Sequence, residues 1–177
     1  MQYYVKKSNE LLNKEIEVTL KFWELEDWYD LGFETFKEKF KKSEFHFLKI
    51  DERIVSLARI NFDFKFKIEN NSYQFAELVG FVSVEKNKGY GTILLEKTIE
   101  NLKQKNIETI GFCEKDLRTF YEKTGTKILY DKANYFLEFD NNKWTKSTDN
   151  DILILNASLK TIDLLQNLGE SNTAFLI

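Results

Sequence analysis

The sequence contains no proline, seven glycines, one cysteine and one histidine in 177 residues. A single cysteine, Cys113, excludes an internal disulfide framework and a zinc site built from several cysteines. Because His46 is the sole histidine, a histidine-based metal site or catalytic triad is disfavoured. Glycine is scarce, so each glycine marks a position where an unusual backbone conformation is expected.

Long hydrophobic runs are also missing. No stretch approaches the ~20 apolar residues that span a bilayer, and the opening Met-Gln-Tyr-Tyr-Val-Lys-Lys lacks the apolar run of a signal peptide. We therefore expect a cytoplasmic protein with no membrane partner.

The net charge of −3 argues against a nucleic-acid partner. A content of 42% hydrophobic and 31% charged residues is typical of globular proteins, and the length predicts a single domain over residues 1–177.

Hydrophobic periodicity predicts the secondary structure. Residues 15–23 alternate and indicate a half-buried strand. Residues 25–42 have helical spacing and indicate one helix, or two short helices broken near Gly32. Further on, the patterns predict strands at 45–50, 54–68, 73–84, 107–113, 126–130, 134–140 and 152–155, and helices at 92–105 and 117–123. Residues 141–151 are polar and are expected to form a loop. This order predicts a mixed α/β fold with helices on the faces of a mixed sheet.

The segment with the clearest chemistry follows strand 73–84 and reads Lys86-Asn87-Lys88-Gly89-Tyr90-Gly91-Thr92. Two glycines one residue apart let backbone N–H groups converge on an anion, and the next helix adds its free N–H groups and positive dipole end. The two lysines add positive charge, so the segment suits a pyrophosphate. The P-loop pattern is absent, and Leu94 stands where a dinucleotide fingerprint needs a third glycine. A tight turn without a ligand explains the loop alone equally well.

A second motif, Phe120-Tyr121-Glu122-Lys123-Thr124-Gly125, follows about thirty positions later. Together the two motifs resemble the GNAT superfamily of acetyltransferases, most strongly over residues 75–129. The resemblance implies a GNAT-like mixed sheet with splayed central strands, here 73–84 and 107–113, and acetyl-CoA as the acyl donor. The chain departs from the family at Lys86, where Gln or Arg is usual, and its loop before Gly89 is short.

The resemblance also assigns roles to residues. The oxyanion donor is a backbone N–H around Phe81–Val82. The residues implied in cofactor binding are Phe81, Val82, Ser83, Val84, Lys86, Asn87, Lys88, Gly89, Tyr90, Gly91, Thr92 and Phe120. Glu77 is implied as the general base, because Phe75-Ala76-Glu77-Leu78 resembles the Phe-Ala-Glu-Ile of the histone-acetylating branch. Tyr121 is implied as the acid that protonates the CoA thiolate.

Each role has a simpler alternative. Glu77 fits the solvated end of a strand, and Tyr121 fits a packed aromatic side chain. Trp28, Tyr29 and Phe33 fall where the family's acceptor pocket is often built, but their helical spacing is equally that of core residues. Cys113 opens a route through an acyl-cysteine, although a small buried side chain is the favoured interpretation. His46 is expected to pack.

The sequence thus predicts an N-acetyltransferase that moves an acetyl group from acetyl-CoA to a primary amine. The acceptor is expected to be a small molecule or peptide that attacks directly in a ternary complex, with no metal and with a monomer or homodimer as the assembly. Two alternatives stay open. One is a CoA-binding module without turnover, which Lys86 and the short loop favour, and the other is an acyltransferase with a protein acceptor.

Overall fold

The computed structural model describes residues 1–177, except the side chains of residues 29–31. The strands are β1 (Gln2–Lys7), β2 (Ser43–Ile50), β3 (Arg53–Ile68), β4 (Asn71–Ser83), β5 (Thr109–Cys113), β6 (Lys127–Leu129), β7 (Phe136–Asp140), β8 (Lys143–Lys146), β9 (Asp151–Asn156) and β10 (Ala174–Leu176). The helices are α1 (Asn13–Phe22), α2 (Phe33–Lys39), α3 (Tyr90–Gln104), α4 (Arg118–Lys123) and α5 (Leu159–Gln166). The short 3₁₀ segments are η1 (Ser8–Glu10), η2 (Glu26–Leu31), η3 (Lys115–Leu117) and η4 (Ala133–Tyr135).

The chain forms two compact units, and β3, β4 and α3 each contribute to both. The first unit holds residues 1–62 and 78–98, and the second holds residues 63–77 and 99–177. Among the described residues, no helix is long and apolar enough to cross a membrane.

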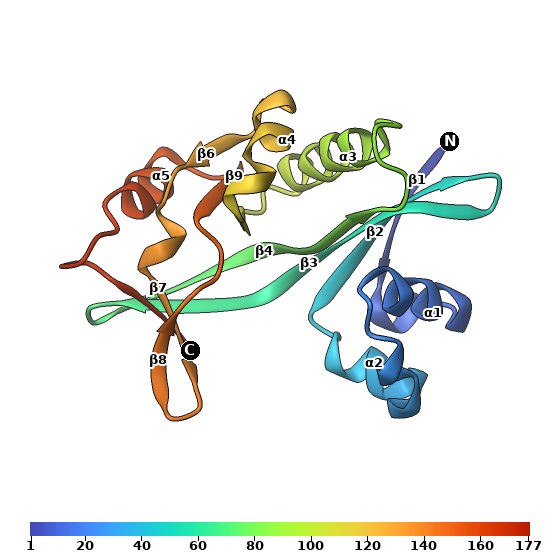
Figure 1. Ribbon diagram of the computed structural model, residues 1–177, viewed down its shortest axis with the longest axis horizontal. Coiled ribbons are helices and arrows are strands. Elements are labelled where there is room, and N and C mark those ends of the chain that lie inside the picture. The colour runs from blue at the N-terminus through green and yellow to red at the C-terminus, as the bar shows by residue number, and fades with distance from the viewer. The chain divides into compact units, whose positions relative to one another are not determined.

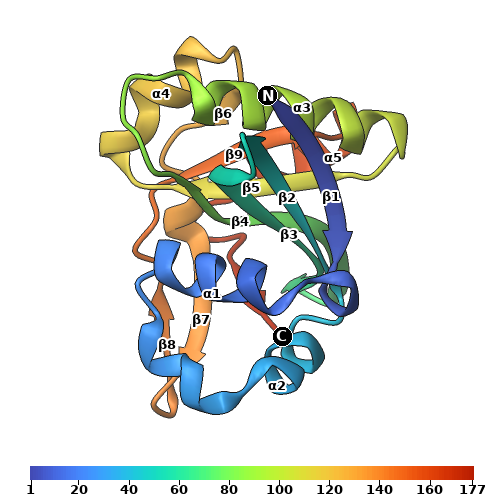
Figure 2. The ribbon, with the colours of Figure 1, turned by 90° about the vertical axis from the view of Figure 1, so that its right-hand side faces the viewer.

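The first unit is built on antiparallel strands. β1 pairs with β2 and β2 pairs with β3, and these strands lie side by side in Figure 2. The β2–β3 hairpin turns through Asp51 and Glu52, both in the left-handed region. The core of the first unit comprises Leu11, Ile16, Leu20, Phe36, Phe45, Phe47, Ile54 and Leu57.

The expected strand at residues 15–23 is wrong, because this stretch lies in helix α1 and the turn after it. A separation of four residues places Ile16 and Leu20 on the same side in either structure, so the alternation did not distinguish them. The buried residues of this stretch are Glu15, Ile16, Thr19 and Leu20, which a helix places on one face and a strand would divide between two faces. The Glu15 carboxylate accepts the Leu12 N–H at 2.9 Å as a helix cap.

The second unit contains a mixed sheet with strand order β6-β9-β5-β4-β3-β10-β7-β8. β9 is antiparallel to β5 and β6, whereas β10 is antiparallel to β3 and parallel to β7. In Figure 1 the labelled strands of this sheet run in colour from turquoise β3 through green β4 to orange-red β9. The Ala76 N–H donates to the Glu108 carbonyl at 3.0 Å, which links β4 to the approach of β5. The mixed α/β fold is confirmed, while the splay of the central strands stays a prediction.

Most other elements follow the sequence patterns, with differences at both ends of the chain. Gly32, with φ +76°, separates η2 from α2 as the two-helix alternative requires. β1, α5 and β10 were not predicted. The polar stretch 141–151 contains β8, whose Trp144 packs on Phe139 and Phe175 at ring-centroid distances of 5.2 and 4.9 Å. The C-terminal run Ala174–Leu176 becomes β10, inside the sheet between β3 and β7.

Candidate functional site

The glycine loop joins β4 to α3 within the first unit. Asn87 and Gly89 have φ values of +63° and +75°, and these left-handed residues turn the chain into the helix. The first helical bond runs from the Ile93 N–H to the Gly89 carbonyl at 3.1 Å. The N–H groups of residues 90–92 therefore have no acceptor inside the helix. The structure thus forms the strand, loop and helix start that the sequence predicts, with Lys86 and Lys88 exposed in the loop.

The end of β4 has a defined orientation. Gly80 lies in mid-strand with φ +61°. Beyond it, the Ser56 hydroxyl donates to the Val82 carbonyl at 2.7 Å, and the Val84 N–H donates to the Val55 carbonyl at 3.1 Å. Backbone groups of successive strand residues alternate in direction. The backbone groups of Val82 therefore point toward β3. The N–H groups of Phe81 and Ser83 point to the opposite side of the strand.

Ser83 provides a test of whether β4 fits a ligand. Its hydroxyl is buried and makes no hydrogen bond to the described part of the chain. Buried hydroxyl groups normally form a hydrogen bond. A polar group of a bound ligand would supply the missing partner of the Ser83 hydroxyl. The open space at Gly89, where an added Cβ has no neighbour within 4 Å, agrees with room beside the loop. Both observations fit the pantetheine and pyrophosphate of an acyl-CoA.

Tyr121 lies in α4 in the second unit, with 5% of its surface exposed. Burial raises its pKa above the ordinary value, and Cys113 and Asp149 raise it further. The Phe120 ring contacts it edge-on at 5.0 Å between centroids. Its hydroxyl therefore keeps its proton at neutral pH and is available as a hydrogen-bond donor, while the raised pKa makes it a weaker acid than an ordinary tyrosine.

A buried ion pair anchors the start of α4. Asp151, fully buried at the start of β9, accepts hydrogen bonds from Arg118 Nη2 at 2.6 Å, from Arg118 Nε, and from the Asp131 N–H at 2.7 Å. Because β9 pairs with β5, this interaction fixes α4, and with it Tyr121, to the sheet of the second unit.

The remaining predicted residues have mixed surroundings. Glu77 is half-buried on β4 between the buried residues Ala76 and Leu78, in the part of the strand that belongs to the second unit. Trp28 and Phe33 pack against the first unit's core. Lys39 Nζ lies 4.9 Å from the centre of the Trp28 ring. The side chain of Tyr29 lies outside the described residues.

The sequence profile of the acetyltransferase (GNAT) family matches residues 9–126. The chain belongs to the GNAT family of acetyltransferases. This confirms the expected acyltransferase class and, at the level of the family, acetyl-CoA as the donor. A search of curated proteins found no match.

Several solved structures have the same fold as this chain. The Campylobacter jejuni N-acetyltransferase PseH, in complex with acetyl coenzyme A, has a TM-score of 0.56 and 16% identity, covering 89% of this chain and 100% of that one. Escherichia coli ElaA has a TM-score of 0.55 and 11% identity, covering 86% and 97%. The Thermoplasma acidophilum PaiA N-acetyltransferase, in complex with coenzyme A, has a TM-score of 0.52 and 18% identity, covering 87% and 99%. At these identities the likeness shows the fold alone.

Cys113 and His46 in this GNAT chain have the structural surroundings that the sequence favours. Burial, followed by the charges of Asp151 and Asp149, raises the pKa of Cys113 to about 12. Since the thiolate is the nucleophilic form, an acyl-cysteine route is disfavoured. His46 is fully buried, and its Nδ1 shares a hydrogen bond of 2.7 Å with the Tyr3 hydroxyl.

Asp149 is a candidate that the sequence did not reveal. It precedes β9 in a polar stretch without a motif, and the Asn150 N–H next to it donates to the Cys113 carbonyl at 3.0 Å. Burial raises the pKa of Asp149, and the charges of Glu114 and Glu138 raise it further. Its charge in turn acts on Tyr121 and Cys113. A carboxylate with a raised pKa, whose charge acts on a buried tyrosine, is a candidate for acid–base chemistry.

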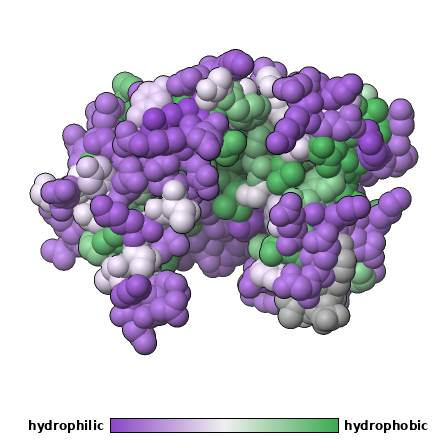
Figure 3. Space-filling view, in the orientation of Figure 1, coloured by the Kyte–Doolittle hydropathy of each residue, from purple (hydrophilic) through white to green (hydrophobic). Residues whose placement is uncertain are grey.

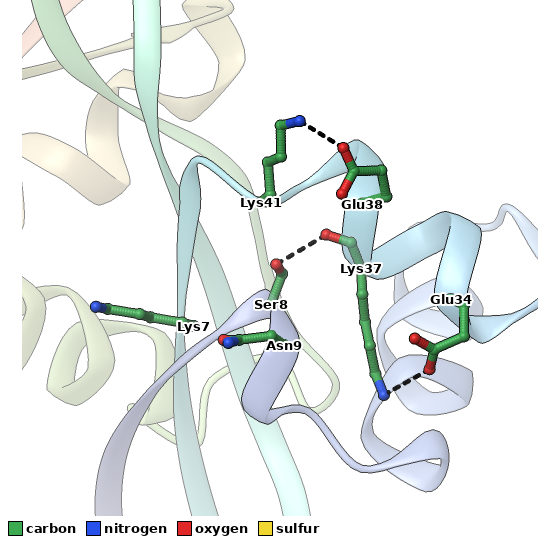
Figure 4. Close-up of a pocket in the computed structure, with 7 residues that line it drawn as sticks. All are labelled: Lys7, Ser8, Asn9, Glu34, Lys37, Glu38 and Lys41. Carbon is green, nitrogen blue, oxygen red and sulfur yellow. Dashed lines mark hydrogen bonds and ion pairs between the residues drawn. The ribbon is translucent and has the colours of Figure 1, made fainter.

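A surface pocket of about 350 Å³ lies elsewhere in the first unit (Figure 4). It is lined by Lys7, Ser8, Asn9, Glu34, Lys37, Glu38 and Lys41. Lys37 pairs with Glu34 at 3.0 Å, and Lys41 pairs with Glu38. These pairs neutralise much of the pocket's charge, and none of the predicted site residues lines it. In Figure 3, hydrophobic side chains gather instead in the right half of the face, between α3 and α1.

Proposed function

We propose that the protein transfers the acetyl group of acetyl-CoA to a primary amine of a small molecule or peptide. The carrying observation is the loop between β4 and α3, where left-handed Asn87 and Gly89 lead into a helix N-terminus flanked by lysines. Such a terminus attracts anions through free N–H groups and the helix dipole. The pyrophosphate of acetyl-CoA is the anion that the GNAT family brings to this position.

The reaction needs a donor for the thioester oxygen, a path for two protons and alignment of the reactants. The amine nitrogen forms a bond to the acetyl carbon, and the bond from that carbon to sulfur breaks. The Phe81 N–H is the proposed donor to the carbonyl oxygen, because the neighbouring Val82 faces β3. Tyr121 supplies a proton to the departing thiolate and regains one from solvent.

The acceptor amine must lose a proton, since its pKa in water is near ~10. Glu77, half-buried on β4, is the proposed base and acts through a water molecule. Asp149 is the second candidate, supported by its raised pKa and its influence on Tyr121. Either carboxylate also favours a cationic acceptor over a neutral one.

A charge placed in the loop tests the cofactor site. Gly91, buried in the first turn of α3, is replaced by Glu. A carboxylate about 4 Å from a phosphate is repelled by roughly 1 kcal/mol in water and more when partly buried, so we expect affinity for CoA to fall by about tenfold or more. Calorimetric titration with CoA measures this. Gly91→Gln, which is similar in size but neutral, separates charge from bulk, and equal affinities for the two variants contradict the placement.

The pH dependence of turnover identifies the base. Glu77→Gln is expected to lower the rate most at neutral pH and to recover part of it as pH rises toward the amine pKa, because free amine then becomes abundant. Asp149→Asn is measured in parallel under saturating acetyl-CoA. The variant whose loss shrinks with pH has lost the base. A Glu77→Gln loss that is constant with pH assigns positioning to Glu77 instead.

The acceptor and the alternative of a binding module are tested together. Polyamines, aminoglycosides, amino acids and peptides with free N-termini are offered with acetyl-CoA, and the release of free CoA thiol is followed. Acceptor-dependent release supports the proposed transfer. Binding of acetyl-CoA without release for any amine favours the CoA-binding module instead.

A further inference from the structure

Trp23, at the C-terminal end of α1, makes close contact with the left-handed residue of β4. Its indole N–H donates to the Gly80 carbonyl at 2.8 Å. A Cβ added at Gly80 would lie 2.5 Å from Trp23 Nε1 and 2.6 Å from Cε2. The indole therefore occupies the space that any larger residue at position 80 would need. The contact with the Trp23 indole therefore requires glycine at position 80. The hydrogen bond to the Gly80 carbonyl restrains the peptide that joins Gly80 to Phe81.

The hydrogen bond fixes a direction. In a trans peptide, the carbonyl of one residue and the N–H of the next point to opposite sides. Because the Gly80 carbonyl points to the Trp23 indole, the Phe81 N–H of the same peptide points away from it. A hydrogen bond accepted by a carbonyl also polarises its peptide and strengthens the N–H as a donor. Trp23 therefore controls both the direction and the strength of the Phe81 N–H.

The indole is itself held in place by aromatic packing. The rings of Phe36, Phe40 and Phe45 lie 6.5, 5.8 and 6.1 Å from the Trp23 ring, measured between centroids. Phe36 and Phe45 are buried in the first unit's core. A side chain restrained on several sides loses few conformations when it forms its hydrogen bond, which suits a positioning role.

We propose that Trp23 is a positioning residue of the acetyl-transfer site, which aims and polarises the Phe81 N–H at the thioester oxygen. The proposal rests on the proposed function, since the Phe81 N–H has this task only if acetyl-CoA binds along β4. Trp23 touches neither reactant in this role and acts through the peptide between Gly80 and Phe81.

The test replaces one atom of Trp23. Incorporation of β-(3-benzothienyl)alanine at position 23 exchanges the indole N–H for sulfur and keeps the ring shape. Losing an oxyanion donor outright costs about 10²–10³-fold in kcat, so loss of its alignment is expected to cost about tenfold. The KM for acetyl-CoA should change by no more than about twofold, since the interaction strengthens in the transition state. Infrared spectra of bound [1-¹³C]acetyl-CoA should show the carbonyl stretch moving to higher wavenumber as polarisation is lost.

The control is Phe47→Leu, which removes a buried ring of the same core that packs on Tyr4 and Phe45, and leaves the Trp23 indole and its hydrogen bond in place. It should lower the melting temperature while kcat and the carbonyl stretch stay as in the wild type. The inference is overturned if the benzothienyl variant keeps wild-type kcat and stretch, or if Phe47→Leu lowers kcat as much. A wild-type protein that does not bind acetyl-CoA overturns the proposed function, and this inference with it.

Discussion

Tyr121→Phe is expected to lower turnover by roughly 10²- to 10⁴-fold, the usual contribution of a positioned acid or base. The ring and its contact with Phe120 remain, so affinity for acetyl-CoA should stay nearly unchanged. Turnover with saturating acetyl-CoA and calorimetric titration with CoA measure the two quantities. The hydroxyl is the only group removed, and the loss is therefore attributable to proton transfer or to a hydrogen bond with the leaving thiolate.

The pH profile sharpens this test. Burial raises the pKa of Tyr121, so the protonated phenol persists beyond the ordinary tyrosine range. An acid stays active below its pKa and is lost above it, so wild-type turnover should show no decline from this group as pH approaches ~10. The matched control is Tyr130→Phe, which removes an exposed phenol bonded to Glu122 at 3.0 Å and should leave turnover unchanged. Wild-type rates in Tyr121→Phe would transfer the acid role to water.

The parts of the site that the sequence predicted are local ones. The loop at residues 86–91 and the Phe-Tyr-Glu-Lys helix are short segments whose motifs carry both structure and chemistry. In each case the structure forms the expected element within a few residues of the expected bounds. Gly89 could be identified because the chain has only seven glycines, and two of them stand one residue apart at this loop. Such a pair indicates that the backbone adopts a conformation that favours glycine.

The parts that the sequence missed depend on contacts between distant residues. Trp23 and Gly80 are 57 positions apart, and neither belongs to a motif. Asp149 lies in a polar stretch, and only its place beside the end of β5 gives it chemical interest. The α1 error has the same origin, because Ile16 and Leu20 satisfy both periodicities until the core of the unit decides between them.

The Arg118–Asp151 pair is expected to contribute strongly to the stability of the second unit, where it fixes the start of α4. Asp151→Ala removes a fully buried carboxylate that accepts three hydrogen bonds, and it leaves the Asp131 N–H without this acceptor. A hydrogen bond to a charged group contributes about 1.5–3 kcal/mol, and a buried N–H left unpaired costs about 1–3 kcal/mol. We expect a total of about 3 kcal/mol, because Arg118 is partly exposed and keeps its hydrogen bond to Asp131 at 3.0 Å. For a chain of this length that lowers the melting temperature by about 6–12 °C.

Glu85→Ala is the matched control, because it removes the carboxylate partner of another arginine. Arg53 Nη2 lies 2.6 Å from Glu85, but the Arg53 side chain is 64% exposed. Exposed pairs contribute about 0–1 kcal/mol, so the melting temperature should fall by no more than a few degrees. Thermal unfolding followed by circular dichroism, with and without CoA, compares the two variants. Similar shifts for both would mean that Asp151 does not anchor α4, and Tyr121 would then have to be held by its own burial alone.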